Sequence, residues 1–208
     1  MLRFLYAHDL AAEPALEDGM FRHRAEQFVR RLGWDLALDA RGWERDDYDA
    51  LNPLYVIWQG EDGAHLGSAR FLPTTGRTMV NEHFAHIAGG PITSPFIWEC
   101  TRLCLAPGAG PEVAAALLLG GSELMRQAEL QHFVGVFDQR MLRVYRGIGA
   151  MPEVLGLEAR IGVGLWAYEP EARARLCARS GVTEDQVQGW YREATTGPRR
   201  SALAVAAE

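Results

Sequence analysis

The sequence predicts a mixed α/β fold, an α/β sandwich in which helices cover the faces of one sheet. Segments with helical periodicity are interspersed with short apolar runs that are typical of strands. Two of these runs flank Glu61-Asp62-Gly63, a sequence typical of a hairpin turn. An early hairpin does not fit the strict βαβ alternation of a doubly wound sheet, so a mixed sheet is expected.

The expected elements follow in chain order. Residues 15–32 are predicted to form a helix, because Phe21, Ala25, Phe28 and Leu32 recur at helical spacing and give one apolar stripe. The hairpin strands are expected at 54–58 and 65–72. The later elements are expected as a strand at 96–105, a helix at 111–131, a strand at 132–137, a helix at 139–145, a strand near 160–168 and terminal helices, the second opening with a capping box of Thr183 and Gln186.

Length and composition favour a single domain over residues 1–193, followed by a flexible tail over 194–208. The net charge of −6 argues against nucleic acid or an anionic membrane as a partner bound through bulk charge. Three cysteines lack disulfide or metal spacing, and the first residues do not resemble a signal peptide. No apolar stretch has the length of a membrane span. A cytoplasmic location is therefore expected.

Charged residues stand in apolar surroundings between residues 21 and 102. Charge inside an apolar strand is costly unless it is paired or used, as for Glu99 and Arg102. The carboxylates and arginines of this region balance formally, so one shared network is expected; an ion pair without function is the alternative. Glu99 and Arg102 are three residues apart in a strand and should face opposite sides, so we predict a bulge between them.

Four motifs in this region follow one another. They are F-x-x-R-x-x-x-F-x-x-x-x-x-W from Phe21 to Trp34, E-x-D-x-Y-D from Glu44 to Asp49, G-x-x-R-x-L-P-T-T over residues 67–75, and W-E-x-[ST]-R from Trp98 to Arg102. Their order and spacing resemble those of the LuxI-type acyl-homoserine-lactone synthases. The resemblance implies a GNAT-like fold, a mixed sheet flanked by helices.

The resemblance also implies the reaction. The amine of S-adenosylmethionine attacks an acyl thioester, carried by an acyl-carrier protein or by CoA, and the methionine carboxylate then closes the lactone and expels methylthioadenosine. S-adenosylmethionine is a substrate here, so no cofactor is expected. The alternative enzyme is a GNAT-type N-acyltransferase that uses acetyl-CoA on another amine.

The family's functional residues transfer to positions of this chain. Glu99 is the candidate general base with Asp46 as the alternative, and Asp46 and Asp49 would attract the cationic substrate. Arg24 is expected to hold the substrate carboxylate, and Arg70 and Arg102 to hold the three carboxylates in place. The aromatic rings expected around the adenine and the sulfonium belong to Phe28, Trp34 and Phe84.

The acyl pocket is expected between the sheet and the helix from residue 111. Its predicted lining is Trp98, Cys100, Leu117, Leu118, Gly135, Val136 and Leu142, with plain core as the alternative for each. Gly135 occupies the position of a family threonine associated with 3-oxo chains, which implies a chain without that group. Trp98 and Phe137 favour a narrow tunnel and a short or branched chain.

The sequence leaves the donor open. Arg140, Arg143 and Arg146 recur every three residues and would suit an acidic carrier protein, although a solvated helix face has the same pattern. Gly108-Ala109-Gly110 precedes a helix, as does the loop that binds CoA pyrophosphate in GNAT enzymes. His83 and His86 lack a third ligand at suitable spacing, so no metal is expected.

Overall fold

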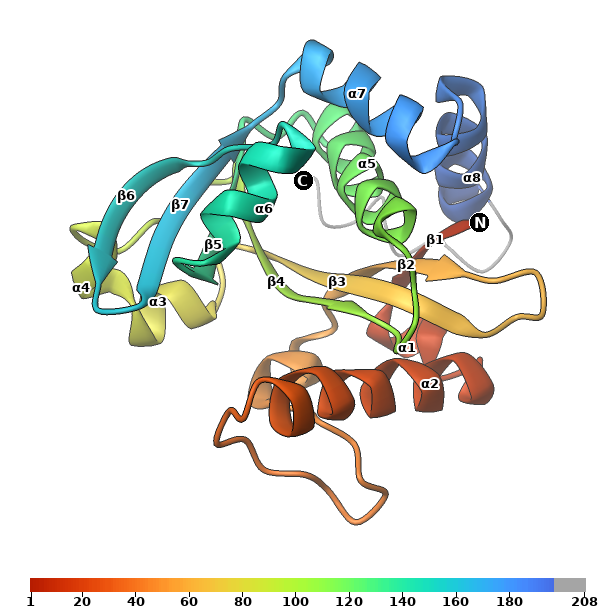
Figure 1. The fold of residues 1–208 in the computed structure, drawn as a ribbon, viewed down its shortest axis with the longest axis horizontal. Coiled ribbons are helices and arrows are strands. Elements are labelled where there is room, and N and C mark those ends of the chain that lie inside the picture. Colours follow the sequence, from red (N-terminus) through yellow and green to blue (C-terminus); the bar gives the residue numbers. More distant parts are fainter. Residues whose placement is uncertain (197–208) are drawn as a thin grey trace.

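The computed structural model describes residues 1–196, and its strands form one seven-stranded sheet (Figure 1). The strands are β1 (Leu2–Tyr6), β2 (Leu54–Gln59), β3 (His65–Pro73), β4 (Ile97–Leu105), β5 (His132–Asp138), β6 (Glu153–Glu158) and β7 (Ile161–Ala167). Their order in the sheet is β1-β2-β3-β4-β5-β7-β6. Neighbours run antiparallel except for β4 and β5, which run parallel. The predicted mixed sheet is thus confirmed.

The helices lie in two layers around this sheet. Their bounds are α1 (Ala7–Leu10), α2 (Pro14–Arg24), the π-helix η1 (Ala25–Arg31), the 3₁₀ helix η2 (Asp47–Leu51), α3 (Met79–His83), α4 (Ala85–Ala88), α5 (Pro111–Gln127), α6 (Met141–Ile148), α7 (Pro170–Ser180) and α8 (Glu184–Thr196). One face carries α5, with α7 and α8 beside it (Figure 1). On the opposite face α2 packs against β2, and α3 and α4 pack against β5 and β7. No helix among residues 1–196 has the length and apolarity to cross a membrane.

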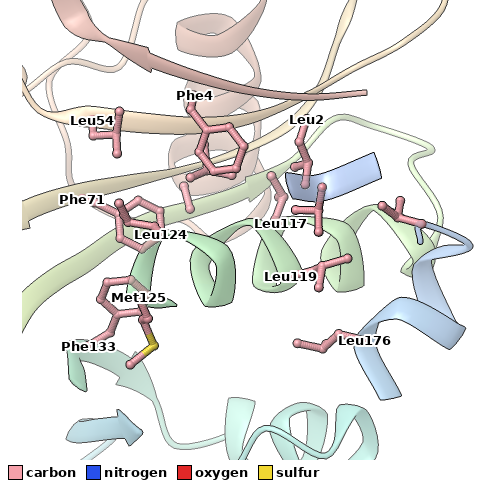
Figure 2. Packing of buried hydrophobic residues seen from close by; sticks show 14 of the residues in the cluster. Leu2, Phe4, Leu54, Phe71, Leu117, Leu119, Leu124, Met125, Phe133 and Leu176 are labelled. Carbon is pink, nitrogen blue, oxygen red and sulfur yellow. The ribbon is translucent and has the colours of Figure 1, made fainter. Parts of the chain in front are cut away.

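The main core fills the space between α5 and the sheet. Figure 2 shows Leu2, Phe4 and Phe71 pointing from the strands toward Leu117 and Leu124 of α5. Burial of such side chains contributes ~1.5–3 kcal/mol each, which makes this layer the main source of stability. The core fixes the position of β3 and β4, and these two strands carry three of the charged residues singled out in the sequence, Arg70, Glu99 and Arg102.

A bulge in β4 was predicted between Glu99 and Arg102; the bulge is present, and it lies at Arg102 and Leu103. Arg70 pairs with Thr101, and Ser68 pairs with Cys104. Ala69, the one residue between them on β3, therefore faces two residues of β4, Arg102 and Leu103. Arg102 takes the left-handed conformation at this point, with a φ of 53°. Both Glu99 and Arg102 therefore contact Met79, through its backbone N–H and its sulfur respectively, and lie on the same side of the sheet.

β4 and β5 pair over only three positions, from Ile97↔His132 to Glu99↔Val134. Beyond Glu99 the two strands separate, and α6 lies beyond the gap (Figure 1). From Cys100 onward β4 has no strand partner on this edge among residues 1–196. A cavity lies beside this part of β4, between β4, α5 and α6.

Several elements differ from those predicted. The helix expected at 15–32 exists, but its second half is a π-helix. The edge strands β1 and β6 were not predicted; β6 is largely exposed and lacks a clear apolar alternation. The capping box of Thr183 and Gln186 is confirmed by two reciprocal hydrogen bonds. Helix α8 continues to Thr196, so the predicted tail is wrong for residues 194–196, which are helical. The rest of that prediction, residues 197–208, lies outside the described residues.

Candidate active site

A buried network of three arginines and three carboxylates lies on the sheet face between α2 and α3. Arg24, at the end of α2, is fully buried and has every side-chain nitrogen paired. Its Nε donates to Glu44 over 2.6 Å, and its two terminal nitrogens donate to Asp49 over 2.8 and 2.9 Å. Burial alone would raise the pKa of Asp49, but the charges of Arg24 and Arg70 outweigh it and hold that pKa far below its ordinary value.

Arg70 is the second buried arginine of the network, and it points from β3 toward the same carboxylates. It donates to Asp49 over 2.9 Å, makes a two-pronged ion pair with Asp46, and donates through Nε to Thr101 over 3.0 Å. Such forked guanidinium–carboxylate pairs are among the strongest hydrogen-bonded pairs in proteins. Tyr55 adds a hydrogen bond of 2.6 Å to Asp49.

Local structure explains the spacing of the residues in the motif E-x-D-x-Y-D. Asp46 is the N-cap of η2: its side chain accepts from the backbone N–H groups of Tyr48 and Asp49, and the Asp49 side chain accepts in return from the N–H of Asp46. This reciprocal capping box holds the two aspartates side by side, where both meet Arg70. Glu44, two residues earlier, is brought against Arg24.

Arg102 and Asp46 form the open edge of the network. Arg102 pairs with Glu44 over 2.9 Å and with Asp46 over 2.8 Å. Their side chains are 7% and 20% exposed, whereas Arg24, Arg70, Glu44 and Asp49 are at most 1% exposed. Solvent and substrate can therefore approach this cluster from the side of Asp46 and Arg102.

Glu99 lies beside the network, and no arginine among residues 1–196 pairs with it directly. Its carboxylate accepts from the backbone N–H of Met79 over 3.1 Å and of Val80 over 2.6 Å. Burial raises the pKa of Glu99, and these two hydrogen bonds only partly offset the effect. The result is a nearly buried carboxylate with an elevated proton affinity, which suits a group that accepts a proton.

Aromatic side chains border the open edge. Trp34 stacks on Phe28 with ring centres 5.0 Å apart and is 40% exposed. The guanidinium of Arg102 lies 5.6 Å from the centre of the Phe28 ring. Phe84, by contrast, lies at the junction of α3 and α4 and contacts His83. In residues 1–196 the three predicted rings therefore do not form one stack.

Two expectations about the network need correction. Arg24 was expected to hold the substrate carboxylate, but it is buried with all its nitrogens engaged, so it positions other side chains instead. Glu99 was expected among the carboxylates held by arginines, and Glu44 takes that place. Glu44 stood in the quoted motif, and its two-residue spacing from Asp46 was the available signal.

A cavity of about 490 Å³ opens where β4 separates from β5. This size is typical of small-molecule pockets. Its apolar walls are Leu103 and Leu105 of β4, Ala114 and Leu118 of α5, and Met141, Val144, Tyr145 and Ile148 of α6. Its rim includes Ala106–Ala109, the loop before α5, and Glu26, Gln27 and Arg31 of η1.

The predicted acyl pocket is only partly this cavity. Leu118 lines it, as expected. Leu117 is instead part of the main core, and Val136 packs with the cluster under α3 and α4 on the other face. Both are therefore core residues, which was the alternative to a place in the acyl pocket. Trp98 and Cys100 pack on the α5 side of β4, and Gly135 lies on β5 near the separation. Leu142 is half-buried on α6.

The arrangement suits a cationic substrate beside a proton acceptor. The three arginines and the carboxylates of Glu44, Asp46 and Asp49 cancel, so an ionised Glu99 leaves the cluster with one net negative charge. Within residues 1–196, no three His, Cys, Asp or Glu side chains are grouped to hold a metal ion. The cavity lies on the opposite side of β4, where an apolar substrate group can approach.

The comparisons with known proteins agree on one family. The family model described as "Autoinducer synthase" matches residues 7–163. An acyl-homoserine-lactone synthase of Rhizobium etli is 43% identical over 179 residues, which cover 80% of this chain and 84% of that protein.

Solved structures show the same fold. A CoA-dependent acyl-homoserine lactone synthase, BjaI, with SAM and isopentyl-CoA, superposes with a TM-score of 0.79 at 21% identity, covering 92% of this chain and 98% of that one. An N-acetyltransferase from Lactobacillus plantarum superposes with a TM-score of 0.56 at 13% identity, covering 81% and 99%. The second likeness confirms the predicted GNAT-like fold.

Proposed function

The chain belongs to the autoinducer synthase family, and we propose that it makes an N-acyl-L-homoserine lactone from S-adenosylmethionine and an acyl thioester. The observation that carries the proposal is the intact arginine–carboxylate network with Glu99 beside it. The product is a quorum-sensing signal, and the enzyme is an acyltransferase. The acyl donor is an acyl-carrier protein or acyl-CoA.

The charges of the site match those of the first substrate. S-adenosylmethionine carries a sulfonium, an ammonium and a carboxylate, and therefore one net positive charge. The cluster carries one net negative charge when Glu99 is ionised. Attraction is strong because the cluster is largely removed from water. The stacked Phe28 and Trp34 offer aromatic faces beside Arg102, which favour a cationic or planar group.

Acyl transfer is the first step. Glu99 takes a proton from the ammonium of S-adenosylmethionine, and the amine attacks the thioester carbonyl across β4. The N–C bond forms, the C–S bond breaks, and the thiolate leaves and takes up the second amine proton. The elevated proton affinity of Glu99 makes it a better base than an exposed glutamate.

Lactone formation is the second step. A carboxylate oxygen of the acylated substrate attacks its own γ-carbon, and the bond from that carbon to sulfur breaks. The sulfonium leaves as the neutral sulfide methylthioadenosine. Because both groups belong to one molecule, the protein has only to hold a folded conformer in near-attack geometry. The reaction uses no cofactor beyond its two substrates, and both substrates are made in the cytoplasm, where we place the enzyme.

The test is product analysis with purified protein. The chain is incubated with S-adenosylmethionine and either acyl-CoA or acyl-carrier-protein thioesters, and methylthioadenosine and lactone are measured by mass spectrometry. We expect equal amounts of both products, a loss of turnover of about 10²-fold or more in Glu99→Gln, and normal turnover in Glu193→Gln, an exposed site on α8. Transfer of an acetyl group to another amine without release of methylthioadenosine would favour the acetyltransferase instead.

A further inference from the structure

The cavity between β4 and α6 ends at an aromatic wall. Leu103, Leu118 and Val144 make its sides apolar, as an acyl chain requires, and Tyr145 stands in its lining. Behind Tyr145 lies Trp166 of β7, with ring centres 5.2 Å apart and ring planes nearly perpendicular. Trp166 therefore lies behind Tyr145 as seen from the cavity, on the side of β5 and β7.

The space beyond that wall is filled by the indole of Trp166. A Cβ atom placed on Gly135 would lie 3.1 Å from Cζ3 of Trp166 and 3.1 Å from the backbone oxygen of Cys100. Cys100 is the first β4 residue past the last pair with β5, so this is where the two strands begin to separate. Because Gly135 has no side chain, the six-membered ring of Trp166 lies flush against β5 at that place.

The indole of Trp166 is held in position from several sides. Its Nε1 donates to the backbone oxygen of Ala150 over 2.9 Å. Phe137 packs against it edge-on, with ring centres 5.9 Å apart, and also against Tyr145 at the same separation. Movement of the indole would break a partly buried hydrogen bond and the packing of three rings, so a flexible chain is not expected to displace it.

We propose that Trp166 closes the inner end of the acyl site and restricts the donor to short acyl chains. This inference rests on the proposed function and names the substrate class of the same site. A chain that enters past Leu118 and Tyr145 meets the indole near the separation of β4 and β5. Each further methylene must push against a packed wall, and one misfit methylene changes kcat/KM by about 10-fold or more.

The experiment measures kcat/KM for butanoyl, hexanoyl, octanoyl and decanoyl donors, each as the CoA and the acyl-carrier-protein thioester. The unmodified enzyme should prefer butanoyl or hexanoyl. Trp166→Leu should raise the octanoyl-to-butanoyl ratio by about 10-fold or more. Trp166→Phe removes the ring atoms that face Gly135 but keeps an aromatic group, and should raise the ratio less. KM for S-adenosylmethionine should stay unchanged.

The matched control is Trp190→Leu, which removes a half-buried tryptophan that packs against Trp58, away from the cavity. This variant should keep the original chain preference. If Trp166→Leu fails to fold in a thermal melt, Trp166→Phe decides. A decanoyl preference in the unmodified enzyme, or an unchanged ratio in the folded variant, overturns the inference alone. Absence of lactone from every donor in the unmodified enzyme would instead overturn the proposed function.

Discussion

Replacement of Arg24 by methionine should destabilise the protein rather than selectively weaken substrate binding. Methionine keeps the length and apolar volume of the side chain but removes its charge. In the folded protein Arg24 is fully buried and donates three charge-assisted hydrogen bonds to Glu44 and Asp49. The variant would leave both carboxylates in a dry environment with fewer partners.

The magnitude follows from what each carboxylate retains. Removing one partner of a buried ion pair costs ~3–5 kcal/mol, because the other charge is left uncompensated. Asp49 still has Arg70 and Tyr55, and Glu44 still has Arg102. We therefore expect the lower end of the range, about 3 kcal/mol. A domain of ordinary stability remains folded after such a loss.

The assay is urea unfolding followed by circular dichroism, with the midpoint lowered by about 1–2 M at an ordinary m-value. The control is Arg22→Met on the same helix, where the arginine pairs with Asp18 in solvent, with side-chain exposures of 55% and 44%. That exposed pair is worth at most ~0.5 kcal/mol. The two variants should therefore differ by more than 2 kcal/mol in the free energy of unfolding.

Two results would contradict a purely structural role for Arg24. If Arg24→Met unfolded within ~1 kcal/mol of Arg22→Met, the buried ion pairs would not be stabilising Glu44 and Asp49 as argued. If stability were normal and only KM for S-adenosylmethionine rose, Arg24 would bind the substrate carboxylate after all, as the sequence pattern indicated.

Three further predictions follow from burial and packing. Burial raises the pKa of Glu99, so kcat/KM should fall as pH drops through that raised pKa. The acid limb of the pH–rate profile should therefore lie at a higher pH than for an exposed glutamate, and an acid limb at the ordinary value would contradict this role of Glu99. Burial, with a smaller contribution from a neighbouring histidine, lowers the pKa of His65 to about 3. The unfolded chain then binds the proton first, so stability should fall from about pH 6.5 downward by up to ~1.4 kcal/mol per pH unit, and His65→Leu should flatten that slope in urea unfolding. Gly120→Ala on α5 should destabilise the protein, because the added Cβ would lie 2.6 Å from Val56. Gly189→Ala on α8 meets no atom within 4 Å and should stabilise the protein by about 1 kcal/mol. Equal melting temperatures for the two variants would show that the packing of α5 is looser than described.

The elements with strong periodicity could be predicted from the sequence, and those without it could not. The stripe of Phe21 and Phe28 and the alanine- and leucine-rich run over 111–131 identified two helices. Strand β6 is exposed over most of its length, so the sequence carried no burial pattern to reveal it. The π-helical geometry of η1 has no simple sequence signal.

The sequence predicted most of the charged residues that form the site, but not which carboxylate pairs with which arginine. Charges inside apolar strands showed that Arg70, Glu99 and Arg102 had to be paired or used, and the bulge followed from the spacing of the last two. Which carboxylate met which arginine depended on how β3, β4 and η2 come together. The exchange of Glu44 for Glu99 in the arginine network is a consequence of that packing.

The sequence by itself determined the family, the mixed sheet and the set of charged residues, because local periodicity and motif spacing are properties of the chain alone. Only the tertiary structure decided that Arg24 is enclosed rather than exposed to substrate, and that Trp166 lies against Gly135. The physical reason is that burial and ring packing arise between segments far apart in the chain. Pairing of β7 with β5 brings Trp166 against Gly135, and nothing in the local sequence of either strand specifies that contact.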